Sequence, residues 1–460
     1  MKKITHYVIV GVFFIFCAGL VLQHFLFKKD DPQRQTQSTK KQKKGSDLEG
    51  RDLELGEVKD QTTQVIDEPS ALFNDPAIKQ AWGLKKSDAA RAWSVTQGSH
   101  DVVVAVIDTG IDENHEDLKN NLWLNPGESG LDKNGKDKAS NGIDDDGNGF
   151  IDDVHGWNFV SNNNKLDDNH GHGTHIAGII GAEAGNKKGI IGISPKVSLM
   201  VLKYFDPKVP NTDNLRNTVA AIRYAVDKGA HIINYSGGGT DYSKEEYEAV
   251  AEAEKRGILF VAAAGNERSN SDQFHYYPAD YKLKNIISVT AIDPTTQVLS
   301  SSNYGTETVD IAAPGQNILS CLPHNSYGLM TGTSQATAFV SGAAALVMSH
   351  KDQFYQAVEI KKYILATGDS YSSLVAKTRT SRQLNLFKSL TILGGETNIS
   401  GAQKSKVNDE FLSDPEKNSS INQDPSLRSV SNATQFGKSL IEAIKNNPEE
   451  KKKNRLGEKN

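Results

Sequence analysis

Cysteine is scarce in this sequence. The 460 residues include two cysteines, Cys17 and Cys321, which cannot form a disulfide framework, and the Cys-x-x-Cys and Cys/His spacings of structural zinc sites are missing. We therefore expect packing of a hydrophobic core, aided by a hard cation, to stabilise the fold.

The sequence also lacks a clustered excess of positive charge. It has 52 Lys and Arg against 57 Asp and Glu, a net charge of -5 and a pI near 6.2, so binding to nucleic acid is not expected. A hydrophobic content of 37% with 39 glycines and 14 prolines excludes a polytopic membrane protein, a collagen and a wholly disordered chain. At roughly 150 residues per domain, the length allows up to about three domains or one large α/β domain.

Long hydrophobic runs are limited to the N-terminus. Residues 1–29 contain an apolar run interrupted by Gln23 and His24, and about 20 apolar residues in a helix are enough to cross a bilayer. We expect a membrane anchor or signal segment here. The length of the run and the Lys28-Lys29 pair after it favour an anchor, whereas Cys17-Ala18-Gly19 resembles a cleavage site.

Polar segments flank the middle of the chain. Residues 30–70 are first basic and then acidic, which predicts a disordered charged tether whose basic half either contacts anionic lipid or is simply solvated. Residues 392–460 form a polar, largely disordered tail with a short amphipathic stretch at 436–444. Residues 71–391 are left as the folded domain.

Apolar runs alternate with helical periodicity in this domain. Leu215, Val219, Ile222 and Val226 form a stripe that predicts a helix, and a second helix is expected over 243–256. Strands are expected at 102–107, 197–203, 231–234, 258–262 and 286–291. The pattern predicts an α/β fold, with a parallel sheet covered by helices on both faces and ligands at the carboxyl ends of its strands.

Three short motifs carry reactive side chains. Asp108 ends the first strand before a Thr-Gly turn, His172 opens a helix of small residues, and Ser334 begins an Ala- and Gly-rich helix. Singly, each has an ordinary structural explanation as a turn residue, a buried histidine or a helix cap. Together, in the order Asp, His, Ser, they match one of the known serine-protease triads.

On these motifs the sequence resembles the subtilisin-like serine proteases, or subtilases, over about residues 72–390. Two further segments support the resemblance, 263–266 (Ala-Ala-Gly-Asn) and 313–315 (Ala-Pro-Gly). Gln335 and Ala338 depart from the methionine and proline that the family typically has there. The departures concern the fine shape of the site, not the reaction.

The resemblance implies a subtilisin-like fold and a serine endopeptidase that hydrolyses polypeptides through an acyl-enzyme. It assigns nucleophile, base and orienting carboxylate to Ser334, His172 and Asp108, and an oxyanion-binding amide to Asn266. A substrate-pairing segment is implied at Ser236, Gly237 and Gly238.

An acidic insertion has the spacing of a calcium loop. Its oxygen donors are expected from Asp144, Asp146, Asn148, the Phe150 carbonyl and Asp152. Position 12 of the loop is His155 in place of glutamate, so Asp153, another loop or water has to complete the shell. The predicted Ca²⁺ is structural, and the alternative is a solvated acidic turn.

Two other functions compete with the protease. A metal-dependent hydrolase would use His170, His172 and His175 with Asp167 or Asp168, although the His-Glu-x-x-His arrangement is missing. A catalytically inactive, protease-like binding module is the second alternative, and the intact triad argues against it. With the apolar N-terminus, we expect a membrane-tethered or secreted enzyme acting outside the cytoplasm, although the lysines after the apolar run oppose that orientation.

Overall fold

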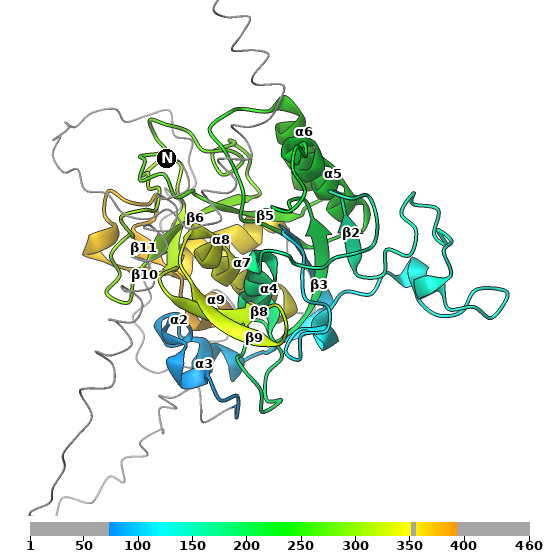
Figure 1. The fold of residues 1–460 in the computed structure, drawn as a ribbon. Helices are drawn as coiled ribbons and strands as arrows, with labels where there is room; N and C mark the ends of the chain where they lie inside the picture. Colours follow the sequence, from blue (N-terminus) through cyan, green and yellow to red (C-terminus); the bar gives the residue numbers. More distant parts are fainter. Residues whose placement is uncertain (1–72, 351–355, 393–460) are drawn as a thin grey trace, which may run out of the picture. The chain divides into compact units, whose positions relative to one another are not determined.

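The computed structural model describes residues 73–350 and 356–392. In this part of the chain, a nine-stranded sheet has the order β10-β11-β7-β6-β5-β4-β1-β3-β2, and all its pairs are parallel except β10 with β11 (Figure 1). Its strands are β1 (Gly98–Asp108), β2 (Gly156–Asn158), β3 (Lys196–Lys203), β4 (Ile232–Tyr235), β5 (Leu259–Ala263), β6 (Ile286–Ile292), β7 (Ile311–Pro314), β10 (Asp369–Ser370) and β11 (Arg382–Gln383). A separate antiparallel hairpin pairs β8 (Ile318–Leu322) with β9 (Ser326–Met330).

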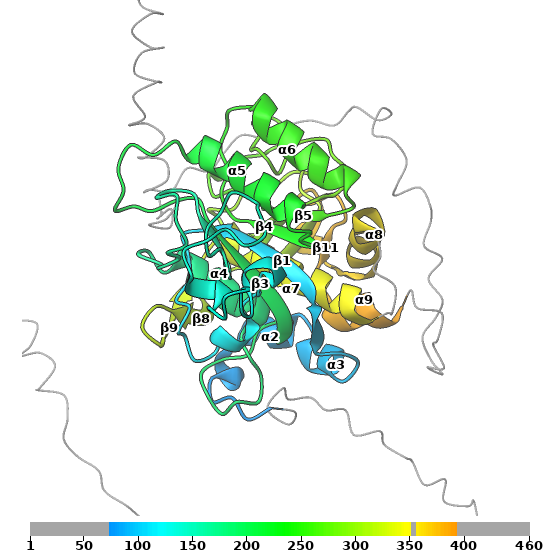
Figure 2. The ribbon, with the colours of Figure 1, turned by 90° about the vertical axis from the view of Figure 1, so that its right-hand side faces the viewer.

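Helices cover both faces of the large sheet. The α-helices are α2 (Trp82–Lys86), α3 (Ala89–Trp93), α4 (His172–Gly181), α5 (Asn214–Asp227), α6 (Lys244–Lys255), α7 (Thr333–His350), α8 (Ala357–Thr367) and α9 (Leu386–Thr391). Short 3-10 helices are η2 (Ile78–Gln80), η3 (Lys119–Asn121), η4 (Pro126–Glu128), η5 (Lys138–Ser140) and η6 (Ser372–Leu374). Figure 2 shows α5 and α6 together on one side of the sheet, with α4 and α7 on the other.

Alternating side chains of β1 supply the two cores. Val104 and Val106 pack into the core that contains α4 and α7, whereas Ala105 and Ile107 pack into the core beneath α5 and α6. Successive side chains of a strand point to opposite faces, so a strand buried on both faces has a continuous apolar sequence. The five predicted strands and the predicted two-sided cover are confirmed.

Local capping explains where the two outer helices begin. The Asp213 side chain accepts the Arg216 N–H at the start of α5, and the Ser243 side chain accepts the Glu246 N–H at the start of α6. Three members of the predicted α5 stripe are buried, but Leu215 is 46% exposed because it lies in the first turn. The prediction that Leu215 packs in the core was therefore wrong.

Helix α7 runs through the core. Every residue from Thr333 to Met348 is buried, and small residues allow this close packing. At Gly342, for example, a Cβ atom would lie 2.6 Å from the Ile193 Cβ. The first turn of α7, with Ser334, is thereby held rigidly against the sheet.

The predicted terminal segments lie largely outside the described residues. This applies to 1–29, 30–70 and almost all of 392–460. Within 73–350 and 356–392, no helix combines the length and the apolar character needed to span a bilayer.

Candidate active site

Neighbouring strands end at one edge of the sheet. β4 pairs in parallel with both β1 and β5, and its last residue, Tyr235, lies opposite Ile107 and Ala262. Asp108 is the last residue of β1, and Asn266 follows shortly after β5. Parallel strands bring their carboxyl ends to the same edge, so remote parts of the sequence meet here.

Asp108 and His172 form a buried pair at this edge. His172 Nδ1 lies 2.7 Å from Asp108 Oδ1, and the two residues are 3% and 2% exposed. The same carboxylate oxygen accepts the Thr109 N–H at 2.8 Å. A neutral imidazole that donates from Nδ1 has its basic lone pair on Nε2, which is the tautomer that a general base requires.

Ser334, Ser236 and Asn266 meet at the start of α7. Ser334 Oγ donates to the Ser236 carbonyl over 3.4 Å, and Ser236 directly follows β4. Asn266 Oδ1 accepts the Thr333 N–H at 3.1 Å. Because that oxygen is engaged, the Asn266 side chain offers its Nδ2 hydrogens as donors at the N-terminus of the helix.

The backbone after β4 has free hydrogen-bonding groups. Among the described residues, the backbones of Gly237 and Gly238 make no backbone hydrogen bond, whereas Gly239 and Tyr277 exchange two bonds of 2.9 and 2.7 Å. An extended peptide can pair with such a segment as an added strand.

Asp168 organises the loop before His172. Its carboxylate accepts hydrogen bonds from the Thr109 hydroxyl, from the backbones of His170 and Gly171, and from both the backbone and hydroxyl of Thr174. Burial by itself would raise the pKa of Asp168, but these donors outweigh burial and hold the pKa below its ordinary value. The sequence had suggested Asp168 only as a metal ligand, so its positioning role was missed.

Asn303 organises the loop that carries Asn266. Its amide donates to the Ala264 carbonyl and to Glu267, and its oxygen accepts the N–H groups of Glu267 and Ser269. Asn303 is 1% exposed. No motif surrounds it, and only its contacts in the fold identify it.

His170, His172 and His175 do not form a metal site with the other described residues. His175 Nε2 bonds to the carbonyls of Ile318 and Gly328, and burial, with His172 nearby, lowers the pKa of His175 to about 3. Asp168 is already engaged by five donors. In the described residues, the metal-ligating groups cluster elsewhere. This geometry argues against the metal-dependent hydrolase.

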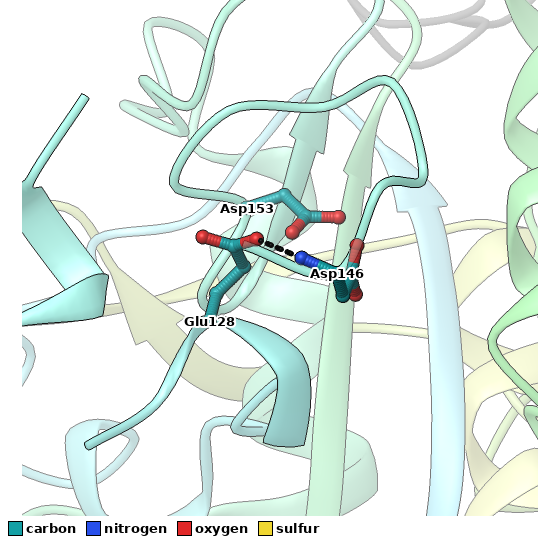
Figure 3. Close-up of side chains that lie close together, drawn as sticks. All are labelled: Glu128, Asp146 and Asp153. Atoms are coloured by element: carbon teal, nitrogen blue, oxygen red, sulfur yellow. Dashed lines mark hydrogen bonds between the residues drawn. The ribbon is translucent and has the colours of Figure 1, made fainter. Parts of the chain in front are cut away.

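That cluster consists of Glu128, Asp146 and Asp153, whose ligand oxygens lie within 4.8 Å of one another (Figure 3). It contains Asp146 from the predicted set, and Asp153, one of the three alternatives considered for completing the shell. Glu128, from η4, carried no sequence signal.

The other side chains that were expected to bind Ca²⁺ accept hydrogen bonds from the backbone of their own loop. Asp144 accepts N–H groups of 147–149, Asp152 accepts the Gly142 N–H, and the Asn148 oxygen accepts the Phe150 N–H. The Phe150 ring packs edge-on against Tyr224 at 5.0 Å.

The charge of the cluster suits a divalent cation. Lys228 Nζ lies 2.5 Å from Asp146 Oδ2 and 3.7 Å from Asp153 Oδ2, so one ammonium contacts two of the three carboxylates. Glu128 Oε2 is buried and has no hydrogen-bond partner in the described part of the chain. Burial, followed by the neighbouring Asp153 among other groups, raises the pKa of Glu128, and burial also raises the pKa of Asp153. A cation would relieve this excess of negative charge.

Comparisons with known proteins agree with this geometry. The sequence model of the Subtilase family matches residues 99–394, more than half of the chain. The chain belongs to the subtilase family. It is 35% identical over 312 residues to a thermophilic serine proteinase of Bacillus sp. strain AK1, covering 66% of this chain and 67% of that protein. It is 34% identical over 302 residues to thermitase of Thermoactinomyces vulgaris, covering 65% of this chain and 92% of thermitase.

A solved protease from Pseudoalteromonas arctica shares the fold of this subtilase. The match has a TM-score of 0.56 and 23% sequence identity, and covers 70% of this chain and 99% of the other. The predicted subtilisin-like α/β fold is confirmed. The enzyme is a subtilisin-like serine endopeptidase, and its substrates are therefore polypeptides.

Replacing Asp168 by Asn should destabilise the subtilase in a pH-dependent way. The Asp168 pKa is lowered on folding, so its contribution is fully present above the unfolded value of about 3.9 and is lost as pH falls through the folded value. We expect Asp168→Asn to lower the free energy of unfolding by about 1–3 kcal/mol at pH 7. Below about pH 4 the difference between the two proteins should become smaller. Denaturant unfolding of the full chain, with Ser334→Ala in all variants to prevent self-digestion, measures this difference.

The exposed neighbour Asp167 supplies a matched control. Asp167→Asn should change the unfolding free energy by less than about 0.5 kcal/mol. Equal losses for both variants, or a loss at Asp168 that does not change with pH, would contradict the positioning role.

Proposed function

We propose that this subtilase cleaves peptide bonds with Ser334 as nucleophile, His172 as general base and acid, and Asp108 as the group that orients His172. The buried 2.7 Å contact between His172 and Asp108, at the sheet edge that also holds Ser334, is the main support. A desolvated carboxylate at Nδ1 fixes the imidazole tautomer and stabilises the imidazolium that forms during the reaction.

The reaction follows from these positions. Ser334 Oγ attacks the scissile carbonyl carbon while its proton passes to His172 Nε2. The developing oxyanion accepts a hydrogen bond from Asn266 Nδ2, whose orientation is set by the Thr333 N–H, with the N-terminal dipole of α7 adding to the stabilisation. His172 then protonates the leaving amine, and water hydrolyses the acyl-enzyme by the same steps in reverse.

Substrates would bind as extended strands. The free backbone of Gly237 and Gly238 lies just past Ser236, whose carbonyl contacts Ser334, so a peptide paired there has a carbonyl within reach of the nucleophile. Main-chain hydrogen bonds of this kind give affinity with little demand on sequence.

Kinetics of two variants test the proposed roles. Ser334→Ala should lose detectable turnover, whereas Asn266→Ala should lower kcat about 10²- to 10³-fold with a small change in KM, because its hydrogen bond forms mainly in the transition state. Hydrolysis of a fluorogenic peptide by the full chain measures both effects, with the exposed Ser300→Ala as control. Undiminished cleavage by Ser334→Ala would contradict the mechanism, and a wild type that binds peptides without cutting them would favour the inactive binding module.

We also propose that Glu128, Asp146 and Asp153 hold a structural Ca²⁺. The buried Glu128 oxygen, which has no hydrogen-bond partner among the described residues, and the excess of three carboxylates over one ammonium support this assignment. A hard cation with carboxylate ligands would join η4 to the acidic loop that precedes β2. Lys228 contacts Asp146 and Asp153 and would compete with the cation for their oxygens.

Calcium binding should raise the Tm of the wild type, because an ion that binds the folded state stabilises it. Glu128→Gln should remove the calcium-dependent shift, whereas Asp144→Asn, which keeps an acceptor for the loop backbone, should retain it. Lys228→Met should tighten calcium binding about tenfold or more, because it removes the competing charge. Scanning calorimetry and titration calorimetry, with Ser334→Ala in all variants, measure these effects. Loss of the shift in Asp144→Asn but not in Glu128→Gln would instead favour the ligand set expected from the loop spacing.

We propose further that residues 1–29 direct the enzyme to the membrane and that the peptidase domain acts outside the cytoplasm, with 30–70 as tether and 392–460 as a tail. The apolar run and the Lys28-Lys29 pair support a retained anchor. One relative of 34% identity is named the major intracellular serine protease of Bacillus subtilis, so location needs a direct test.

Protease accessibility tests the topology. In intact bacterial spheroplasts that express the full-length Ser334→Ala variant, added trypsin should cleave the lysine-rich tether and release the domain, and deletion of 1–29 should move the protein into the soluble fraction. Lysed spheroplasts are the control. A domain that resists trypsin until lysis would place it in the cytoplasm.

A further inference from the structure

The space beside the reacting carbonyl lies between two glycine-containing segments. If Ser334 and Asn266 fix the carbonyl, as proposed above, its residue pairs with the backbone after β4, and its side chain must fit between that segment and the loop after β5. β4 and β5 are adjacent in the sheet, so these two segments are neighbours. Gly238 belongs to the first and Gly265 to the second.

The Tyr276 ring lies against both glycines. A Cβ atom at Gly238 would come within 2.4 Å of Tyr276 Cε1, and one at Gly265 within 3.0 Å of Tyr276 Cδ2. Tyr276 is 8% exposed. The ring therefore fills the space that separates the two backbones.

The backbone around Tyr276 fixes the position of the ring. The Tyr276 N–H donates to Asp280 Oδ2 at 2.8 Å, and the next residue, Tyr277, pairs with Gly239 through two backbone hydrogen bonds. Gly239 adjoins the proposed substrate-pairing segment. Movement of the ring away from the substrate would thus disturb the segment that binds the substrate backbone.

We propose that Tyr276 determines specificity by restricting the substrate residue before the cleaved bond to a small side chain, such as glycine, alanine or serine. This inference depends on the proposed function, because Ser334 and Asn266 place the carbonyl. The restriction is steric, because the phenol of Tyr276 carries no charge that could attract or repel a side chain. Burial, followed by the charge of Glu267, raises the pKa of this phenol well above its ordinary value. A well-packed site accommodates additional side-chain volume only with strain.

A peptide series tests the proposal with the full-length enzyme. The peptides differ only in the residue before the cleaved bond, which is Ala, Ser, Leu or Phe, and kcat/KM is measured for each. We expect the wild type to favour Ala over Phe by about 100-fold or more. Tyr276→Gly should raise the Phe-to-Ala ratio at least about tenfold. Tyr276→Phe, which keeps the ring, should retain the wild-type ratio.

Tyr242→Ala is the matched control, because Tyr242 is exposed and its ring contacts Tyr247, Tyr277 and Tyr281. It should leave the ratio unchanged. An unchanged Phe-to-Ala ratio in Tyr276→Gly, or a wild type that prefers Phe, would overturn the proposal. If Tyr276→Gly fails to fold, the size preference of the wild type across the peptide series tests the proposal. Cleavage that persists in Ser334→Ala would instead refute the proposed function, whereas Ser334-dependent cleavage without a size preference would refute this inference alone.

Discussion

The common carboxyl edge of three parallel strands is the constraint on which the site depends. β1, β4 and β5 are adjacent and in parallel register, so Asp108, Ser236 and the loop to Asn266 emerge together although the sequence separates them widely. The buried helix α7 adds Ser334 at the same edge. Neither the sheet nor α7 can shift without disrupting a close-packed core. The site side chains are therefore fixed in position before a substrate arrives.

Holding charged groups in a dry site costs free energy that surrounding hydrogen bonds must offset. The Asp108 carboxylate receives the Thr109 N–H as well as His172, and the Thr109 hydroxyl in turn links Asp168 to the Gly173 N–H. Asn303 holds the opposite loop by four hydrogen bonds. The residues with a proposed chemical role are therefore few, and the residues that hold them in position are more numerous.

The two departures from the family pattern have different surroundings. Ala338 is fully buried inside α7. Gln335 is 2% exposed, and its side-chain oxygen would lie 3.2 Å from a Cβ atom at Gly332, close to Asn266. The amide of Gln335 thus contributes polarity near Asn266, the proposed oxyanion-binding side chain, where the family typically has a methionine.

Local sequence patterns predicted the strands, two of the helices and the site motifs. Continuous apolar runs predicted the five strands, the apolar stripe at 215–226 predicted α5, and a second helix was expected over 243–256. Motifs selected Asp108, His172 and Ser334 as site candidates. Asp168, Asn303, Glu128 and Tyr276 depend on contacts between remote segments, for which the sequence has no local signal. The calcium-loop spacing indicated the right region but emphasised Asp144 and Asp152, whose carboxylates bond to backbone N–H groups of their own loop.

The central claim is that Ser334, His172 and Asn266 act on one carbonyl group. A crystal structure of the full-length protein after reaction with a peptidyl phosphonate tests it most directly, because the phosphonyl group mimics the tetrahedral intermediate. We predict a covalent bond from Ser334 Oγ to phosphorus and a phosphonyl oxygen about 2.7–3.2 Å from Asn266 Nδ2. Phosphorus bonded to another residue, or a phosphonyl oxygen directed away from Asn266, would contradict the account.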